Sequence, residues 1–448
     1  MILMDKKPVV VIGRSRRPET LAQDFVFTDA SLPISGPLQD YRHGAWETFK
    51  RLPIPTVKDE AWRRTDLVGM PVANFHLPSE KRDLDLKSLP EGLLNPLGDA
   101  SNGGRVILHT GGAKIDLSDS LKRAGVIFTD FGTAEREHPE LLKRLAGSLV
   151  HAGDGKFAAL AAAMAQKGVL VYIPKGLNLE QPLLSLFWAP GSELAHFSHI
   201  LVWVDDGASL TYLHETASPA NDGPSLHTGI MEILVGNGAS LKFVELQSWG
   251  NQVWNFNHQK AQVQQDGRLE WIFGLVGSRL TKSFSGVDLV GEGSTSLLSG
   301  FYFTDGHQHF DLSTRQDHLA PNTTSDLLYK GALKGQSRSI WRGMVYVAKG
   351  AQKANGYQVN RNLVLSKGSH ADSIPGLEIL ADDVRCSHGA TVGKLEQEPL
   401  FYLKSRGLPD KDAEHLLVEG FFDPIMQRIP FESIRDRFQQ AIEQKMNS

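Results

Sequence analysis

The feature that most constrains the fold is a glycine that returns at nearly regular intervals through a long β-rich region. Between about residues 168 and 400, short strand-like runs alternate with a glycine, then a small or polar residue, then an apolar one. The first four of these glycines, Gly207, Gly238, Gly267 and Gly293, are 31, 29 and 26 residues apart. Stacked coils need a permissive residue at each tight bend, so this spacing predicts a solenoid.

We expect that solenoid to be a parallel β-helix, because its coils pair strand over strand and hide most strand edges. One segment, residues 358–363, supports this interpretation. Gln358, Asn360 and Asn362 alternate onto one face of a strand, as expected where amides hydrogen-bond along a stack. A β-sandwich with long hairpins is the alternative that the pattern alone leaves open.

Helical patterns flank the β-rich region. Residues 141–146 and 157–165 are rich in strong helix formers, and the prolines of residues 52–56 indicate a linker or turn. Two apolar stripes after residue 409 predict further helices, formed by Ala413, Leu416, Leu417, Gly420 and Phe421, and by Ile434, Phe438, Ile442 and Met446. The predicted fold is mainly β, with an N-terminal α-rich domain (1–165), a β-helix core (166–405) and a C-terminal helical domain (406–448).

Composition excludes several classes of protein. The 448 residues carry a net charge of −4 without a basic stripe, so we expect no nucleic-acid partner. No stretch approaches the roughly 20 apolar residues of a membrane span, so we expect no membrane partner. The apolar run at residues 9–12 is too short for a signal-peptide core. The expectation is a soluble, cytoplasmic protein.

The chain has a single cysteine, Cys386, which excludes an internal disulfide and any metal centre held by several of its own thiolates. In a strand, Cys386 and His388 would share a face, with α-carbons about 6.5–7 Å apart. A thiolate and an imidazole at that separation can reach one metal ion. The alternative is a buried cysteine that packs as a small hydrophobe beside a hydrogen-bonded histidine.

A second candidate metal site is His307, His309 and Asp311, which would share one strand face. Two histidines and a carboxylate are the ligands of some non-heme iron sites, although a hairpin or a solvent-facing strand also explains them. The sequence contains no G-x-x-x-x-G-K-[ST], H-E-x-x-H or G-x-S-x-G motif. This chain therefore has no P-loop that could bind nucleotide phosphates.

Several of these segments are similar to one known family. Residues 373–393, SIPGLEILADDVRCSHGATVG, resemble the C-terminal signature of the SufB/SufD family of iron–sulfur cluster assembly proteins. Residues 60–66, 342–347, 358–365 and 400–407 also resemble family segments, and the resemblance spans about 60–430. The Cys386-Ser387-His388 triplet looks like the SufD form.

The resemblance implies a right-handed parallel β-helix and a non-catalytic scaffold subunit of the SUF machinery. It would act with a SufB-like subunit and a SufC-like ABC ATPase in cluster assembly and iron acquisition, and ATP would be hydrolysed on SufC. His388, with Cys386, would be the candidate ligand at the SufB interface. The isolated chain would hold no stable cofactor, because iron or a cluster would be transient and shared with SufB.

The resemblance also places partner binding in the C-terminal helices. The residues predicted to contact a partner are Arg406, Gly407, Leu416, Leu417, Phe421 and Pro424. Two rival hypotheses are a homodimeric SufD that binds iron through His307, His309 and Asp311 apart from SufB, and a β-helix enzyme acting on polysaccharide.

Overall fold

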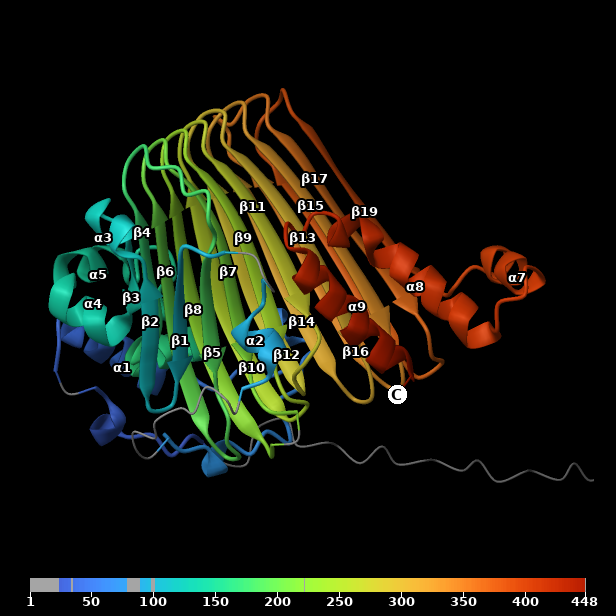
Figure 1. The fold of residues 1–448 in the computed structure, drawn as a ribbon, viewed down its shortest axis with the longest axis horizontal. Helices are drawn as coiled ribbons and strands as arrows, with labels where there is room; N and C mark the ends of the chain where they lie inside the picture. The colour runs from blue at the N-terminus through green and yellow to red at the C-terminus, as the bar shows by residue number, and fades with distance from the viewer. Residues whose placement is uncertain (1–23, 34, 79–88, 98–100, 221, 448) are drawn as a thin grey trace, which may run out of the picture.

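Two long β-sheets face each other and the chain alternates between them, as the computed structural model shows (Figure 1). It describes residues 24–33, 35–78, 89–97, 101–220 and 222–447, so the apolar run at 9–12 lies outside the described residues. In one sheet, the even-numbered strands from β4 to β18 pair in parallel. In the other sheet, the odd-numbered strands from β5 to β19 pair in parallel. The predicted parallel β-helix is therefore confirmed, with about eight turns, and the β-sandwich is wrong.

The strands of the odd-numbered sheet, in spatial order, are β19 (Arg385–Gly393), β17 (Asn355–Val364), β15 (Thr324–Leu333), β13 (Thr295–Thr304), β11 (Arg268–Leu275), β9 (Ser240–Ser248), β7 (Ser209–Ala217), β5 (Leu183–Trp188), β1 (Gly104–His109) and β2 (Gly112–Leu117). Those of the even-numbered sheet are β18 (His370–Ile379), β16 (Arg338–Val347), β14 (His309–His318), β12 (Leu280–Leu289), β10 (Val253–Val263), β8 (Ser225–Val235), β6 (Ala195–Val204), β4 (Lys167–Ile173) and β3 (Ile127–Asp130).

The corners explain most of the glycine spacing. At one edge of the solenoid a left-handed residue recurs in each turn, at Gly207, Gly238, Asp266, Gly293, Asn322 and Lys353. Gly207, Gly238 and Gly293 have φ between 61° and 73°, a conformation that glycine adopts without steric cost. At the third corner Asp266 takes that conformation, with φ 54°, instead of the neighbouring Gly267. The left-handed corner residue predicted at Gly267 is therefore one position earlier in the chain, at Asp266.

The predicted row of amides lies inside the coil. Gln358, Asn360 and Asn362 are all at most 1% exposed, so their alternation onto one face is confirmed. The Asn362 side-chain amide donates to Asn360 Oδ1 at 2.6 Å, and Tyr302 donates to Asn362 Oδ1 at 2.5 Å. These bonds satisfy buried polar groups that would otherwise destabilise the last turns.

Helices cover both outer faces. The N-terminal region contains α1 (Gln39–Arg51), α2 (Glu91–Leu94), α3 (Asp119–Arg123), α4 (Phe131–Glu137), α5 (Pro139–Leu145) and α6 (Lys156–Met164), which begins just after η5 (Ala152–Asp154). All nine residues of α6 are buried, and the helix packs with α1 on the even-numbered sheet through an apolar cluster that includes Trp46, Phe157 and Phe256. The region is not purely helical, because β1, β2 and β3 extend the two sheets.

The C-terminal helices cover the odd-numbered sheet. They are α7 (Gln397–Ser405), α8 (Asp410–Met426) and α9 (Glu432–Asn447), and α8 and α9 lie across the strands while α7 projects from the body (Figure 1). The predicted seam of Ile434, Phe438 and Ile442 is buried against the sheet. In α8 the buried residues are Ala413, Val418, Phe422, Ile425 and Met426, so the predicted stripe through Leu416 and Gly420 was wrong. Within the described residues no helix is long and apolar enough to cross a membrane.

Candidate functional site at the open end of the solenoid

The two ends of the solenoid differ. At the N-terminal end, the edge strands β2 and β3 are short, run antiparallel to β1 and β4, and are connected to each other through α3. At the C-terminal end, β19 pairs only with β17 and β18 only with β16, as far as the described residues show. The last turn therefore presents two strand edges whose outer backbone groups have no strand partner, a geometry that favours pairing with another chain.

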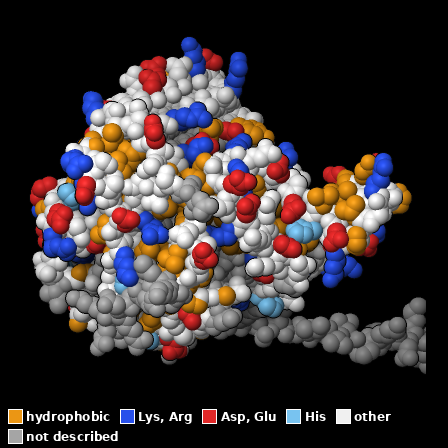
Figure 2. Space-filling view, viewed as in Figure 1, with side chains coloured by type: hydrophobic (Ala, Val, Ile, Leu, Met, Phe, Trp, Pro, Cys, Tyr) orange, Lys and Arg blue, Asp and Glu red, His pale blue; other side chains and the backbone are white. Residues whose placement is uncertain are grey.

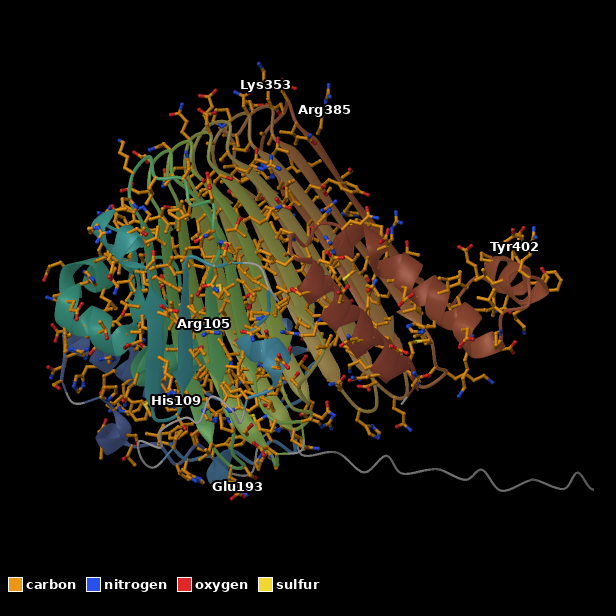
Figure 3. The ribbon with its side chains drawn as sticks, in the orientation of Figure 1. Arg105, His109, Glu193, Lys353, Arg385 and Tyr402 are labelled. Carbon is orange, nitrogen blue, oxygen red and sulfur yellow. The ribbon has the colours of Figure 1, made fainter. Side chains whose placement is uncertain are left out.

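Apolar side chains are exposed around that last turn. Leu380 is 52% exposed, Val392 47%, Tyr357 39% and Ile379 38%. Side chains of this kind beside an unpaired strand edge are typical of a surface that a partner covers. Figure 3 shows Lys353 and Arg385 together at the rim of this end, where both point away from the coil.

Cys386 and His388 lie on β19, at the open end. Their register partners on β17 are Gly356 and Gln358. Gln358 points into the coil and is fully buried, and parallel register partners share a face, so Cys386 and His388 face the interior side of the last turn. Cys386 is half-buried, while His388 is exposed because no further turn covers it.

The surroundings of Cys386 favour the neutral thiol. It packs against a small apolar cluster of Val345, Val347, Ala351 and Ala354. Burial raises the pKa of the Cys386 thiol, with a hydrogen bond involving Gly356 as the opposing, smaller effect. A metal ion arriving at this end would have to displace the thiol proton, because the thiolate is the ligand.

The second candidate site is not assembled as the sequence suggested. His307 lies in the exposed turn before β14 and does not share a strand face with His309. His309 and Asp311 are both on β14, but each contacts the N-terminal region: Thr65 Oγ1 lies 3.2 Å from His309 Nε2 and donates to Asp311. Among the described residues, no three His, Cys, Asp or Glu side chains gather in a way that could hold a metal ion.

Asp311 instead belongs to a buried ion pair that fixes the N-terminal region to the sheet. Lys282 Nζ lies 2.8 Å from Asp311 Oδ2, and both side chains are fully buried. Lys282 also donates to the Ala61 carbonyl at 2.7 Å, and Arg342 donates to the same carbonyl at 2.5 Å. The segment around Ala61 and Thr65 is therefore held to the sheet by Lys282 and Arg342 at Ala61, and at Thr65 by His309 and Asp311, two of the predicted metal ligands.

The predicted partner-binding residues divide into two groups. Arg406, Gly407, Leu416 and Pro424 are exposed, and Gly407 ends α7 in a left-handed conformation with φ 95°. Leu417 is half-buried, and Phe421 packs against the cluster under α8 while Lys330 lies over its ring at 4.8 Å. Phe421 therefore serves the chain's own packing.

Sequence reasoning missed the most exposed apolar side chains, which are on α7. Phe401 is 73% exposed and Tyr402 55%, and α7 buries none of its residues. Figure 2 shows hydrophobic side chains gathered on this projecting part of the molecule, and Figure 3 places Tyr402 on it. The available signal was the run of four apolar residues at 400–403, which wraps around a helix and cannot be covered by one face.

Comparison with known proteins gives the same family along most of the chain. Residues 187–421 match the model described as SUF system FeS cluster assembly, SufBD core domain, and residues 114–184 match the SufBD protein N-terminal region. An iron-sulfur cluster assembly SufBD family protein of Staphylococcus haemolyticus is 31% identical over 408 residues, which is 88% of this chain and 86% of the relative. One of Staphylococcus epidermidis is 30% identical over 440 residues, 94% of this chain and 92% of the relative.

The chain is a parallel β-solenoid with helices on both faces, and its sequence matches the family model and the relatives named above. Together these findings define an iron–sulfur cluster assembly protein. More particularly, the chain belongs to the SufBD family.

Proposed function

We propose that this chain is a non-catalytic SufD-type scaffold subunit, which joins a SufB-like subunit at the open end of its solenoid and a SufC-like ATPase through α7. The observation that carries the proposal is the uncovered last turn with Cys386 and His388 on its inner side. The SufD assignment rests on the Cys386-Ser387-His388 triplet. The ATPase is placed on a partner because the sequence has no P-loop.

Joining two solenoids end to end would satisfy both strand edges at once. A partner strand laid along β19 or β18 would take up the free backbone groups and cover Ile379, Leu380 and Val392. The same contact would bring the partner's side chains opposite His388. Half of the site is then supplied by each chain.

A shared site fits the ligand count. Iron–sulfur clusters are usually held by four protein ligands, mostly thiolates, and this chain offers one thiol and one imidazole at the open end. The nascent cluster, or its iron, is the cargo of the complex and not a resident cofactor of this subunit. A site split between two chains can open or close when the chains move relative to each other.

The test is cluster formation on the reconstituted three-protein complex after His388→Ala. We expect the chain to fold and join its partners as before, while cluster yield, followed by iron and sulfide content and visible absorption, falls by roughly tenfold. His307→Ala is the matched control, because His307 is also exposed but lies in a turn away from β19. An unchanged yield after His388→Ala would refute the role of His388.

A further inference from the structure

A groove on the outer face of the even-numbered sheet has no role in the function proposed above. Its volume is about 480 Å³, within the usual range of binding clefts. Strands β10, β12, β14, β16 and β18 form its floor, so one end of the groove reaches the last turn of the solenoid. Val150 and Asp154 of the N-terminal region border it.

The register of the strands explains why this face is hollow. One row across the strands runs His258, Phe284, Ser313, Arg342 and Ile374, and the next runs Lys260, Gly286, Arg315, Met344 and Gly376. Met344 lies over Gly376, because a Cβ placed on that glycine would be 2.8 Å from the Met344 methyl carbon. The hollow therefore lies over the small residues Gly286 and Ser313, which stand between larger side chains.

The groove suits an apolar occupant. Its apolar lining is only partly covered by the chain itself and comes from Phe284, Met344, Ile374 and Pro375. Each cation of the lining is already paired with a carboxylate: Lys260 with Asp288 at 2.9 Å, Arg315 with Asp317 at 2.7 Å and Arg342 with Asp311 at 3.7 Å. The remaining charge is negative and belongs to Asp154 at the border, where its carboxylate accepts the His151 N–H.

The same chain contains an apolar segment that the function proposed above does not use. Residues 9–12 read Val-Val-Val-Ile and precede the described residues. An uncharged run of β-branched residues is an aggregation hazard when it is left in water, so it gains from being covered. Three arginines follow it within five residues, at positions 14, 16 and 17. Their charge is complementary to that of Asp154 at the border of the groove.

The described chain begins beside the border of the groove. Phe25 packs edge-on against Phe157 of α6, with 6.3 Å between the ring centroids. Gly155 stands just before α6, and a Cβ placed on it would be 3.6 Å from Nε2 of His258, which lines the groove. The twelve residues from 13 to 24 can span up to about 40 Å, whereas the five strands of the floor are about 20 Å across. The run at 9–12 is therefore tethered within reach of the whole groove.

We propose that this groove is the docking site of residues 9–12 of the same chain, whose aliphatic side chains lie against Phe284, Met344 and Ile374. Because the chain leaves the groove toward Asp24, the arginines at 14, 16 and 17 lie on the side of Asp154. The tether keeps the run at a local concentration in the millimolar range, so even a weak contact is populated. The docked run covers the outer face of β18 beside the open end, and no partner is needed for this contact.

The first test compares full chains carrying ¹³C-methyl methionine. Val9→Asp with Val11→Asp should expel the run and shift the methyl signal of Met344, which lines the groove, while Met426, 4% exposed beneath α8, keeps its signal. Thr20→Asp with Gln23→Asp is the matched control, because it adds the same charge outside the run and should leave Met344 in place. A Met344 signal unaffected by the substitutions at 9 and 11 would leave the groove to another occupant and overturn the proposal.

The second test supplies the segment from outside. A synthetic peptide of residues 5–17 is titrated into the full chain that carries Val9→Asp and Val11→Asp, and it should return the Met344 signal to its position in the unchanged chain. The peptide is added up to about 5 mM, because the tethered run has a local concentration of that order. The same peptide with Val9→Asp and Val11→Asp should have no effect. A native peptide that leaves Met344 where it is would refute the docking site.

Substitutions in the groove locate the contact. Gly286→Leu and Ser313→Leu each fill the hollow without changing charge, and each should weaken peptide binding about tenfold or more. Gly44→Leu, at an open position on α1, should leave peptide binding unchanged. A folded groove-filling variant that binds the peptide as tightly as before would contradict the proposal, and two such variants keep the test decisive if one does not fold. All of these measurements use the chain alone, so they are independent of cluster assembly on the complex.

Discussion

At the scale of single residues, the Lys282–Asp311 pair is a buried ion pair on which the attachment of the N-terminal region depends. Two fully buried charges 2.8 Å apart are stable only while each has its partner, because the desolvation of either charge alone is not offset. Thr65 donates to Asp311 and Lys282 donates to the Ala61 carbonyl, so the pair ties the N-terminal region to β12 and β14. Lys282 and Asp311 therefore contribute to the free energy of folding, and we assign them no role in binding metal.

Replacing Asp311 by alanine should lower the free energy of unfolding by about 3–5 kcal/mol, because Lys282 is left buried without a counter-charge. The matched control is Asp317→Ala, on the same face of β14, which breaks a pair with the half-exposed Arg315 and should cost about 1 kcal/mol or less. Urea unfolding followed by circular dichroism measures both. Equal small losses would contradict the structural role of Asp311.

Glu245 gives the stability a specific dependence on pH. Its side chain is inside the coil, where burial raises the pKa to about 8, although Gln259 and Trp271 donate hydrogen bonds to it. Between its unfolded pKa and 8 the folded state holds a proton that the unfolded state has lost. Stability therefore falls as pH rises through that window, by up to about 1.4 kcal/mol per pH unit.

The variant Glu245→Gln, which has the shape of the protonated carboxyl, should remove this contribution. Measured by urea unfolding at several values between pH 5 and 8, the stability of the variant relative to the unchanged chain should increase steadily with pH. Comparing the two proteins cancels the titration of the buried histidines, which is common to both. A difference that stays constant across the range would show that Glu245 is already ionised in the fold.

At the scale of elements, α7 and α8 have different tasks. Residues of α8 and α9 complete the core over the odd-numbered sheet, while α7 presents Phe401 and Tyr402 to solvent. Truncation after Gly407 would remove α8 and α9 and uncover the sheet while leaving α7 in place, so it tests the covering of the sheet and not the docking of a partner on α7. Substitution on α7 separates them.

Phe401→Ser with Tyr402→Ser should weaken binding of the SufC-like ATPase by at least about 30-fold, or ~2 kcal/mol, as exposed aromatic residues at an interface do. The melting temperature of the chain should not change, since α7 buries none of its residues. Ile115→Ser is the control, because Ile115 is 41% exposed on β2 at the other end of the solenoid. Binding is measured by titration calorimetry, and undiminished binding by the α7 variant would move the docking surface elsewhere.

The elements also show how far the sequence alone could lead. The spacing of Gly207, Gly238 and Gly293 was enough for the solenoid, because each corner needs a left-handed residue. The role of His309 and Asp311 could not be found this way, since Thr65 and Lys282 reach them from distant parts of the chain. The buried face of α8 could not be found either, because Leu416 and Val418 fit a helical period equally well and docking on the sheet decides between them.

At the scale of the whole molecule, the asymmetry of the ends is the central feature. Short antiparallel strands, β2 and β3, end the solenoid on one side, whereas the longer parallel strands β18 and β19 end it on the other, with Cys386 and His388 on the inner side of that last turn. In the function proposed above, the chain folds by itself and its site is completed by a partner. The sequence signature at residues 373–393 coincides with β18 and β19, the last turn of the solenoid.

The most direct test uses the fact that Cys386 is the only cysteine in the chain. Its rate of alkylation by iodoacetamide is measured by mass spectrometry in the isolated chain and after binding of the SufB-like subunit, with and without the ATPase. If the open end is the subunit interface, the partner should slow the reaction at least tenfold, and the ATPase alone should have no effect. An alkylation rate that stays the same when the SufB-like subunit is bound would contradict the account.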